Sequence, residues 1–75
     1  MSFDEALTVF ADPLAMIFDD EDHSIDEQRE IIIGHSVRLR LLVVCFSPRE
    51  ATVRILSARS ATKREREAYE ESDQS

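Results

Sequence analysis

The sequence has little of what marks several classes of protein. One glycine, two prolines and no tryptophan occur in 75 residues, and this composition argues against a low-complexity or disordered chain. The single cysteine, Cys45, excludes an internal disulfide and fits a reducing compartment. No apolar run approaches roughly 18 residues, and no basic segment followed by a hydrophobic one opens the chain. We therefore expect a cytoplasmic protein with no membrane span and no signal peptide.

The length allows one small domain, which we expect to span residues 1–75. A chain of this size buries only about 60% of its unfolded surface, so its core is small. We expect marginal stability unless a partner contributes to it.

Charge is distributed unevenly along the chain. The net charge of −7 would by itself disfavour binding to nucleic acid. Residues 1–30 hold ten acidic side chains and one basic side chain, whereas residues 29–66 hold nine basic and three acidic ones. Every lysine and arginine lies in this second segment. The local charge, and not the total, therefore indicates what the chain binds.

Periodicity and capping residues predict a helix, four strands and a second helix. Ser2 and Glu5 have the spacing of a capping box, so the first helix starts almost at the first residue, and Asp12-Pro13 ends it. Connections as short as those between the strands favour antiparallel neighbours. The predicted fold is α+β, a four-stranded antiparallel sheet flanked by an N-terminal and a C-terminal helix. The predicted strands are residues 14–18, 29–35, 39–46 and 51–58, and the last helix covers residues 62–72.

The first helix carries apolar residues at helical spacing, and we expect this face to belong to the core. In the second strand, Gly34 permits either a bulge or a close approach of another backbone. The apolar residues of the first helix are Phe3, Ala6, Leu7 and Phe10.

Residues 19–28 (DDEDHSIDEQ) are acidic and show no periodicity. A calcium loop places glycine at its sixth position and glutamate at its twelfth, and counting from Asp20 these positions are Ile25 and Ile31. The segment is therefore predicted to be a solvated hairpin loop. The alternative is that His23 joins the surrounding acids in a metal site.

Strand alternation indicates where the arginines of the sheet point. Both faces of the third and fourth strands carry apolar residues, so both are expected to be covered at least in part. The arginines then reach past that cover at the ends of the strands, or their long stems pack along the sheet edge. The predicted faces are Arg38 and Arg40 with Leu42, Arg54 with Leu56, and Arg59 with Val53 and Ile55.

The corner between the fourth strand and the last helix predicts an anion site. Thr62 and Glu65 have the spacing of a capping box. Lys63 and Arg64 add positive charge to the first helical turn, where the helix dipole favours carboxylates. Such a local conflict is tolerated most often where function requires it. The alternative is that the charges of this helix form ordinary solvated pairs.

Four stretches together resemble the BrnT family of bacterial type II toxins, and they cover nearly the whole chain. The resemblance implies a RelE-like ribonuclease fold and a toxin that cleaves RNA and blocks translation. It also implies a BrnA antitoxin that neutralises the toxin and represses the operon through a ribbon-helix-helix DNA-binding domain. The stretches are SFDEALTVFADPLA, REIIIGHS, RLLVV and RILSARSATKREREAYEE.

Individual positions match the family pattern, with some departures. Leu39 stands where the family pattern has glycine, and Gln28 where an acid is usual. The family's N-terminal strand and helix have no counterpart before Ser2, which implies a bare sheet edge and a homodimer or an antitoxin-bound assembly. The matching residues are Arg29, Gly34, Arg40, Arg54, Ser57, Ala58, Arg59, Ala61, Glu65 and Tyr69.

The resemblance and the residues together predict an endoribonuclease that needs no metal and no cofactor. The RNA 2′-hydroxyl is the expected nucleophile, which requires a base, an acid and cations around the phosphate. We assign phosphate stabilisation to Arg59 and Arg40, the general base to Glu65 and a supporting hydrogen bond to Tyr69.

RNA contacts beyond the reacting groups are expected from the remaining basic side chains. His35 is either a second proton carrier or only a polar residue that ends a strand. A rival prediction is a catalytically inactive binding protein or corepressor subunit that keeps the basic face for an acidic or DNA-bound partner. The expected RNA-binding residues are Arg29, Arg54, His35, Lys63 and Arg64.

Overall fold

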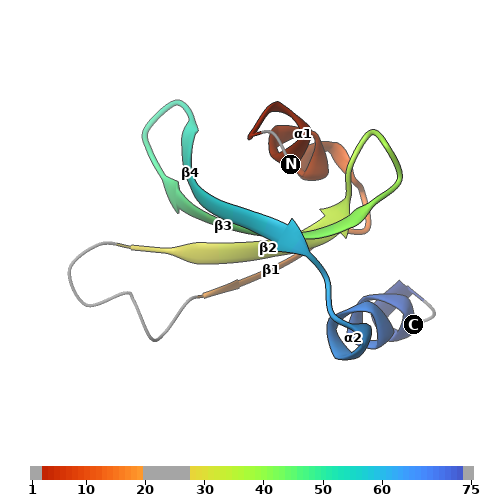
Figure 1. Ribbon diagram of the computed structural model, residues 1–75. Coiled ribbons are helices and arrows are strands. Elements are labelled where there is room, and N and C mark those ends of the chain that lie inside the picture. Colours follow the sequence, from red (N-terminus) through yellow and green to blue (C-terminus); the bar gives the residue numbers. More distant parts are fainter. Residues whose placement is uncertain (1–2, 20–27, 74–75) are drawn as a thin grey trace.

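The computed structural model describes residues 3–19 and 28–73 and has an α+β fold (Figure 1). Its four strands form one antiparallel sheet in the order β1-β2-β3-β4, as the sequence predicts. The N-terminal helix lies on one face of the sheet, and the C-terminal helix lies at one end of the other face. The elements are α1 Phe3–Thr8, the 3₁₀ turn η1 Val9–Ala11, β1 Met16–Asp19, β2 Glu30–His35, β3 Leu41–Pro48, β4 Val53–Ser60 and α2 Lys63–Asp73.

The central strand β3 is covered on both faces, as its continuous apolar run predicts. Leu42, Val44 and Phe46 pack with Ala6 of α1 in one cluster. Alternate residues of the same strand point the other way and pack against Tyr69 of α2. The second cluster comprises Ile33, Leu41, Val43 and Tyr69, with Met16, Ile31 and Ala61 at its border.

The predicted apolar face of the first helix is only partly correct. Ala6 is fully buried and Phe10 packs edge-on against Phe46, with ring centroids 4.9 Å apart. Phe3 and Leu7, however, are 57% and 47% exposed. The α-helix ends at Thr8 and continues as a tighter 3₁₀ turn, and the buried side of the two comprises Glu5, Ala6 and Val9. The predicted helix start at Ser2 and the acidic loop at residues 20–27, with His23, lie outside the described residues.

The strand β4 contains a bulge that overturns the predicted face of Arg59. Cys45 pairs with Ser57 and the next residue, Phe46, pairs with Ile55, so Leu56 is an extra residue. Beyond the bulge the alternation is reversed. Arg59 therefore lies on the face of Leu56, opposite to the face on which Val53 and Ile55 pack.

The β2–β3 turn is longer than predicted, because β3 begins at Leu41. Arg38 and Arg40 precede the strand and are exposed, so the prediction that they share a strand face with Leu42 is wrong. Leu39 has a φ of 62° and is 82% exposed. A left-handed backbone at this position explains why the family pattern has glycine there.

Helix α2 begins as the capping box predicts. The backbone N–H of Thr62 donates to Glu65 Oε1 at 2.8 Å, and the N–H of Glu65 donates to Thr62 Oγ1 at 3.2 Å. One turn later, the Tyr69 ring is buried against the sheet, with 4% of its surface exposed. Neither α2 nor any other helix in the described part of the chain is long and apolar enough to cross a membrane.

Candidate active site

Arg59 and Glu65 form a two-point ion pair at the corner between β4 and α2. Arg59 Nη1 donates to Glu65 Oε1 at 2.7 Å, and Nη2 donates to Oε2 at 2.8 Å. Arg59 Nη1 also donates to the carbonyl of Ser60 at 3.3 Å. A planar guanidinium held at two points has a fixed orientation, which a single ion pair does not provide.

The pair keeps both partners charged. The hydrogen bonds from Arg59 lower the pKa of Glu65 from an ordinary 4.5 to about 2, against an opposing effect of burial. The N–H and hydroxyl of Thr62 contribute in the same direction. The same contact with Glu65 raises the pKa of Arg59. A carboxylate with so low a pKa is a weak base, so this geometry suits orientation of Arg59 better than proton transfer.

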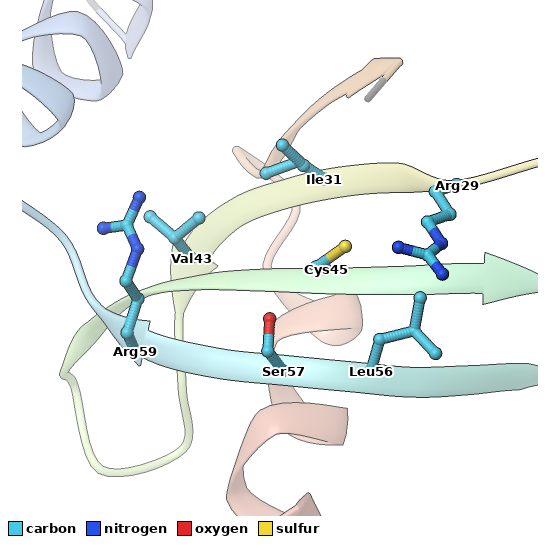
Figure 2. A pocket seen from close by; sticks show the side chains of 7 residues that line it. All are labelled: Arg29, Ile31, Val43, Cys45, Leu56, Ser57 and Arg59. Carbon is cyan, nitrogen blue, oxygen red and sulfur yellow. The ribbon is translucent and has the colours of Figure 1, made fainter. Parts of the chain in front are cut away.

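A cavity of about 530 Å³ opens on the sheet face that carries Arg59 (Figure 2). Arg59 and Arg29 stand at opposite ends of it, and Ser57 and Cys45 lie between them. The bulge at Leu56 makes this arrangement possible, because it turns Ser57 and Arg59 to the side of Arg29. The lining contains two arginines and no acid, so it favours an anionic ligand. Its members are Arg29, Ile31, Val43, Cys45, Leu56, Ser57 and Arg59.

A second polar group lies beneath the next turn of α2. Tyr69 Oη donates to Asp12 Oδ2 at 2.7 Å, and the backbone N–H of His35 donates to the same oxygen at 2.7 Å. His35 Nδ1 lies 3.1 Å from Tyr69 Oη and 3.8 Å from Asp12 Oδ2. The His35 and Tyr69 rings meet edge to face, with centroids 5.0 Å apart. Asp12, which follows η1, is thus joined to His35 of β2 and Tyr69 of α2.

Asp12 is the acceptor that holds this group together. Burial raises the pKa of Asp12, but hydrogen bonds from His35, Tyr69 and Leu14 outweigh it, so the pKa lies below the ordinary value. A Cβ on Gly34 would lie 3.1 Å from Asp12 Oδ2 and 3.0 Å from the Cβ of Ala15. The sequence predicts a bulge or a close backbone approach at Gly34, whereas the atoms nearest to the position of its missing Cβ are side-chain atoms of the segment that carries Asp12.

Sequence reasoning missed Asp12 as a site residue. Its place before proline identified it only as the end of a helix. Its partners His35 and Tyr69 lie 23 and 57 residues further along the chain. No short-range pattern records such contacts.

Both groups lie on the same side of the sheet. His35 pairs with Leu41 and Arg59 pairs with Val43, and these two β3 residues share the face that packs against Tyr69. Only β3 separates the strands of His35 and Arg59, a lateral distance of about 10 Å. On α2, Glu65 and Tyr69 are one turn apart, so the helix contacts both groups at once.

The other predicted site residues lie apart from this arrangement. Arg40 Nε is 3.4 Å from Glu5 Oε2 of α1, a nearly buried carboxylate that also accepts a hydrogen bond from Ser36 Oγ. The side chains of three further basic residues are exposed, one on β4 and two in the first turn of α2. These are Arg54, Lys63 and Arg64.

The arrangement supplies a fixed cation, a second cation across a cavity and an imidazole joined to a carboxylate through a phenol. Such groups suit the binding of a phosphate and the movement of a proton beside it. Across residues 3–19 and 28–73, no three His, Cys, Asp or Glu side chains are grouped so that they could hold a metal ion.

Comparison with known proteins assigns the family. A comparison with curated proteins gives no match. A comparison with protein families matches residues 1–65 to the family described as "Ribonuclease toxin, BrnT, of type II toxin-antitoxin system". The match covers most of the chain and includes Asp12, His35, Arg59 and Glu65, whereas Tyr69 lies beyond it. The chain belongs to the BrnT family of ribonuclease toxins of type II toxin-antitoxin systems.

Proposed function

We propose that this chain is a toxin that cleaves RNA without a metal ion and thereby inhibits translation. In this reaction the 2′-hydroxyl of the RNA attacks the adjacent phosphorus and releases the 5′-oxygen of the next nucleotide. Negative charge then builds up on the phosphate oxygens, which is where a fixed cation lowers the barrier.

The observation that carries the proposal is the geometry of Arg59. Its guanidinium is held at two points by Glu65 and stands at one end of the cavity that Arg29 closes at the other. We assign Arg59 to the scissile phosphate and Arg29 to a neighbouring phosphate of the same strand. Arg54, Lys63 and Arg64 extend the positive surface for the rest of the RNA.

In this proposal Glu65 acts through Arg59. Both of its oxygens accept from the guanidinium, and Oε1 also accepts from Thr62. A pKa of about 2 leaves it a poor proton acceptor near neutral pH. Orientation of Arg59 replaces the role of general base that the spacing of Glu65 suggested.

The test is cleavage of single-stranded RNA by the purified chain in excess chelator. We expect products that end in a 2′,3′-cyclic phosphate, and a loss of roughly 10²- to 10³-fold in rate for Arg59→Ala. Arg66→Ala is the matched control, because it removes the same charge from an exposed position of α2 outside the cavity. Equal cleavage by wild type and Arg59→Ala would remove Arg59 from the site, and loss of wild-type cleavage in chelator would contradict metal independence.

We further propose a BrnA-type antitoxin with a ribbon-helix-helix domain as the partner, in a homodimer or an antitoxin-bound assembly. Large apolar side chains on the surface support a protein partner. Two of them, Val37 and Leu39, lie in the β2–β3 turn and are 73% and 82% exposed. Co-purification with the product of the adjacent reading frame tests the pairing. Sedimentation of the chain alone as a stable monomer would contradict a homodimer.

The rival function is that of an inactive toxin-like binding protein or corepressor subunit. The cleavage assay and the co-purification together distinguish it from a ribonuclease. Binding to the antitoxin without RNA cleavage by wild type would support it. Cleavage that depends on Arg59 would exclude it.

A further inference from the structure

We propose that Asp12 and Tyr69 are positioning residues that hold His35 with a proton on Nδ1, so that Nε2 accepts the proton of the RNA 2′-hydroxyl. This inference rests on the proposed ribonuclease function, because it names the base for that reaction. It assigns Asp12 a part that the sequence did not suggest.

The direction of the Tyr69 proton follows from its two neighbours. A phenol has one proton to donate, and an ionised carboxylate can only accept. Tyr69 Oη lies 2.7 Å from Asp12 Oδ2 and 3.1 Å from His35 Nδ1. The carboxylate is the stronger acceptor and the nearer one, so the proton of Tyr69 points to Asp12.

The tautomer of His35 follows from that direction. The Tyr69 hydroxyl donates its hydrogen bond to Asp12, so its oxygen can only accept a hydrogen bond from His35. Nδ1 of His35 must therefore carry the hydrogen. This tautomer is assigned from the heavy-atom network. In neutral imidazole the other nitrogen, Nε2, then has the free lone pair.

The surroundings of His35 leave Nε2 accessible. The His35 side chain is 37% exposed, whereas Asp12 and the Tyr69 ring next to Nδ1 are nearly buried. The exposed part of the ring is therefore its Nε2 side. His35 also lines a cavity of about 430 Å³ with Thr8, Val37 and Leu39, which gives a ribose room to approach.

Groups from several elements surround His35. Asp12, which follows η1, and Tyr69 of α2 contact it. Glu5 of α1 and Arg40 of the turn meet each other beside Ser36, the residue that follows His35. Nδ1 thus stays bonded to Tyr69 while Nε2 takes up and releases the proton.

The chemical step balances as follows. Nε2 takes the 2′-proton as the 2′-oxygen bonds to phosphorus, and the bond from phosphorus to the 5′-oxygen breaks. The 5′-oxygen takes a proton from water, and the imidazolium returns its proton to the hydroxide that remains. Arg59, across β3 on the same face, holds the phosphate on which the charge builds up.

The tautomer can be measured without any activity. We would record nitrogen chemical shifts of the imidazole in a His23→Gln chain, in which His35 is the only histidine. The neutral form is expected to carry its proton on Nδ1, and Tyr69→Phe is expected to move the population toward Nε2–H. A proton on Nε2 in the chain that retains Tyr69 overturns the proposal.

The rates test the same assignment. We expect His35→Ala to lose about 10²- to 10⁴-fold in kcat, and Tyr69→Phe to lose about tenfold in kcat with KM nearly unchanged. Phenylalanine keeps the ring that packs on Ile33 and Leu41, so the substitution removes the hydroxyl and leaves this packing in place.

Different results would overturn the proposed ribonuclease function and the role of His35 in it. A wild-type chain that does not cleave RNA at any pH overturns the proposed function and the catalytic part of His35 with it. A wild-type chain that cleaves, beside a folded His35→Ala chain that cleaves equally well, overturns the part of His35 alone. A Tyr69→Phe chain that keeps the wild-type tautomer of His35 and the wild-type kcat removes Tyr69 as a positioning residue.

Discussion

The guanidinium of Arg59 and the carboxylate of Glu65 meet in two parallel hydrogen bonds of 2.7 and 2.8 Å. Glu65→Gln keeps an oxygen that can cap Thr62 but replaces the second acceptor with an amide that donates. Arg59 then loses its fixed orientation, and we expect kcat for RNA cleavage to fall about tenfold, or ~1.4 kcal/mol in the barrier. Steady-state kinetics on a short RNA measures this.

Glu67→Gln is the control for that substitution. It removes the same charge from an exposed position of α2, and its kcat should equal that of wild type. A Glu65→Gln chain with full kcat would show that the orientation of Arg59 by Glu65 does not matter to the rate.

The same pair predicts an acid dependence of stability. Because the folded pKa of Glu65, about 2, is below its ordinary 4.5, its contribution is present above 4.5 and is lost as the pH falls toward 2. The Arg59 side chain is 55% exposed, so we expect at most about 1 kcal/mol at neutral pH. Thermal unfolding of wild type and Glu65→Gln, measured between about pH 7 and pH 2, gives the difference in stability between them. This difference should shrink as the pH falls from 4.5 to about 2. A difference that stays constant with pH would contradict the assignment.

Gly34→Ala should destabilise the chain and disturb the Asp12 group. The new Cβ would lie 3.0 Å from Ala15 Cβ, 3.1 Å from Val9 Cγ1 and 3.1 Å from Asp12 Oδ2. Overpacking of this kind costs about 1–3 kcal/mol and outweighs the roughly 0.5–1 kcal/mol gained by removing a flexible residue from a strand. Urea unfolding measures the loss, with the exposed Glu70→Ala as a neutral control. Unchanged stability would mean that the segment of Asp12 can move aside.

Leu39→Gly should stabilise the chain. Leu39 has a φ of 62°, and no other non-glycine residue in the described ranges has a positive φ. A left-handed backbone costs about 1–2 kcal/mol for an L-residue, whereas the added flexibility of unfolded glycine costs about 0.5–1 kcal/mol. We therefore expect a net gain below about 1 kcal/mol in urea unfolding. Val37→Gly, in the same exposed turn, should instead destabilise, and a similar loss for both variants would contradict the reasoning.

Arg40→Ala should affect folding more than chemistry. Arg40 Nε lies 3.4 Å from Glu5 Oε2, and Glu5 is only 8% exposed. Removing the cation deprives the nearly buried Glu5 carboxylate of this ion pair, which we expect to lower the free energy of unfolding by about 1–3 kcal/mol. We expect a lower melting temperature with kcat unchanged at a temperature where the chain is folded. Arg38→Ala, exposed in the same turn, is the control, and a large fall in kcat for Arg40→Ala would restore it to the catalytic set.

Short-range signals predicted much of the fold. The antiparallel order of the strands follows from apolar runs separated by short connections, and the start of α2 follows from the Thr62–Glu65 capping box. Arg59 and Glu65 lie close together because both belong to the short corner between β4 and α2. These features depend on residues close together in the chain, which is why the sequence shows them.

Features that depend on distant contacts were not predictable in the same way. Nothing in the order of residues distinguishes Leu56 as the extra residue of a bulge, and simple alternation therefore placed Arg59 on the wrong face. Asp12 looks like a helix end until β2 and α2 are folded against it. The exposure of Phe3 depends on how α1 packs on the sheet, which buries Ala6 and Val9 instead.

The extra residue in β4 gives that strand a margin in its length. Loss of the single codon for Leu56 would remove the bulge and place Ser57 directly after Ile55, and plain alternation would then still turn Ser57 and Arg59 away from α1. Such a descendant would lose one apolar side chain from the cavity and keep both of its arginines. In this family, therefore, loss of the bulge residue is expected to be tolerated more readily than a change of Arg59 itself.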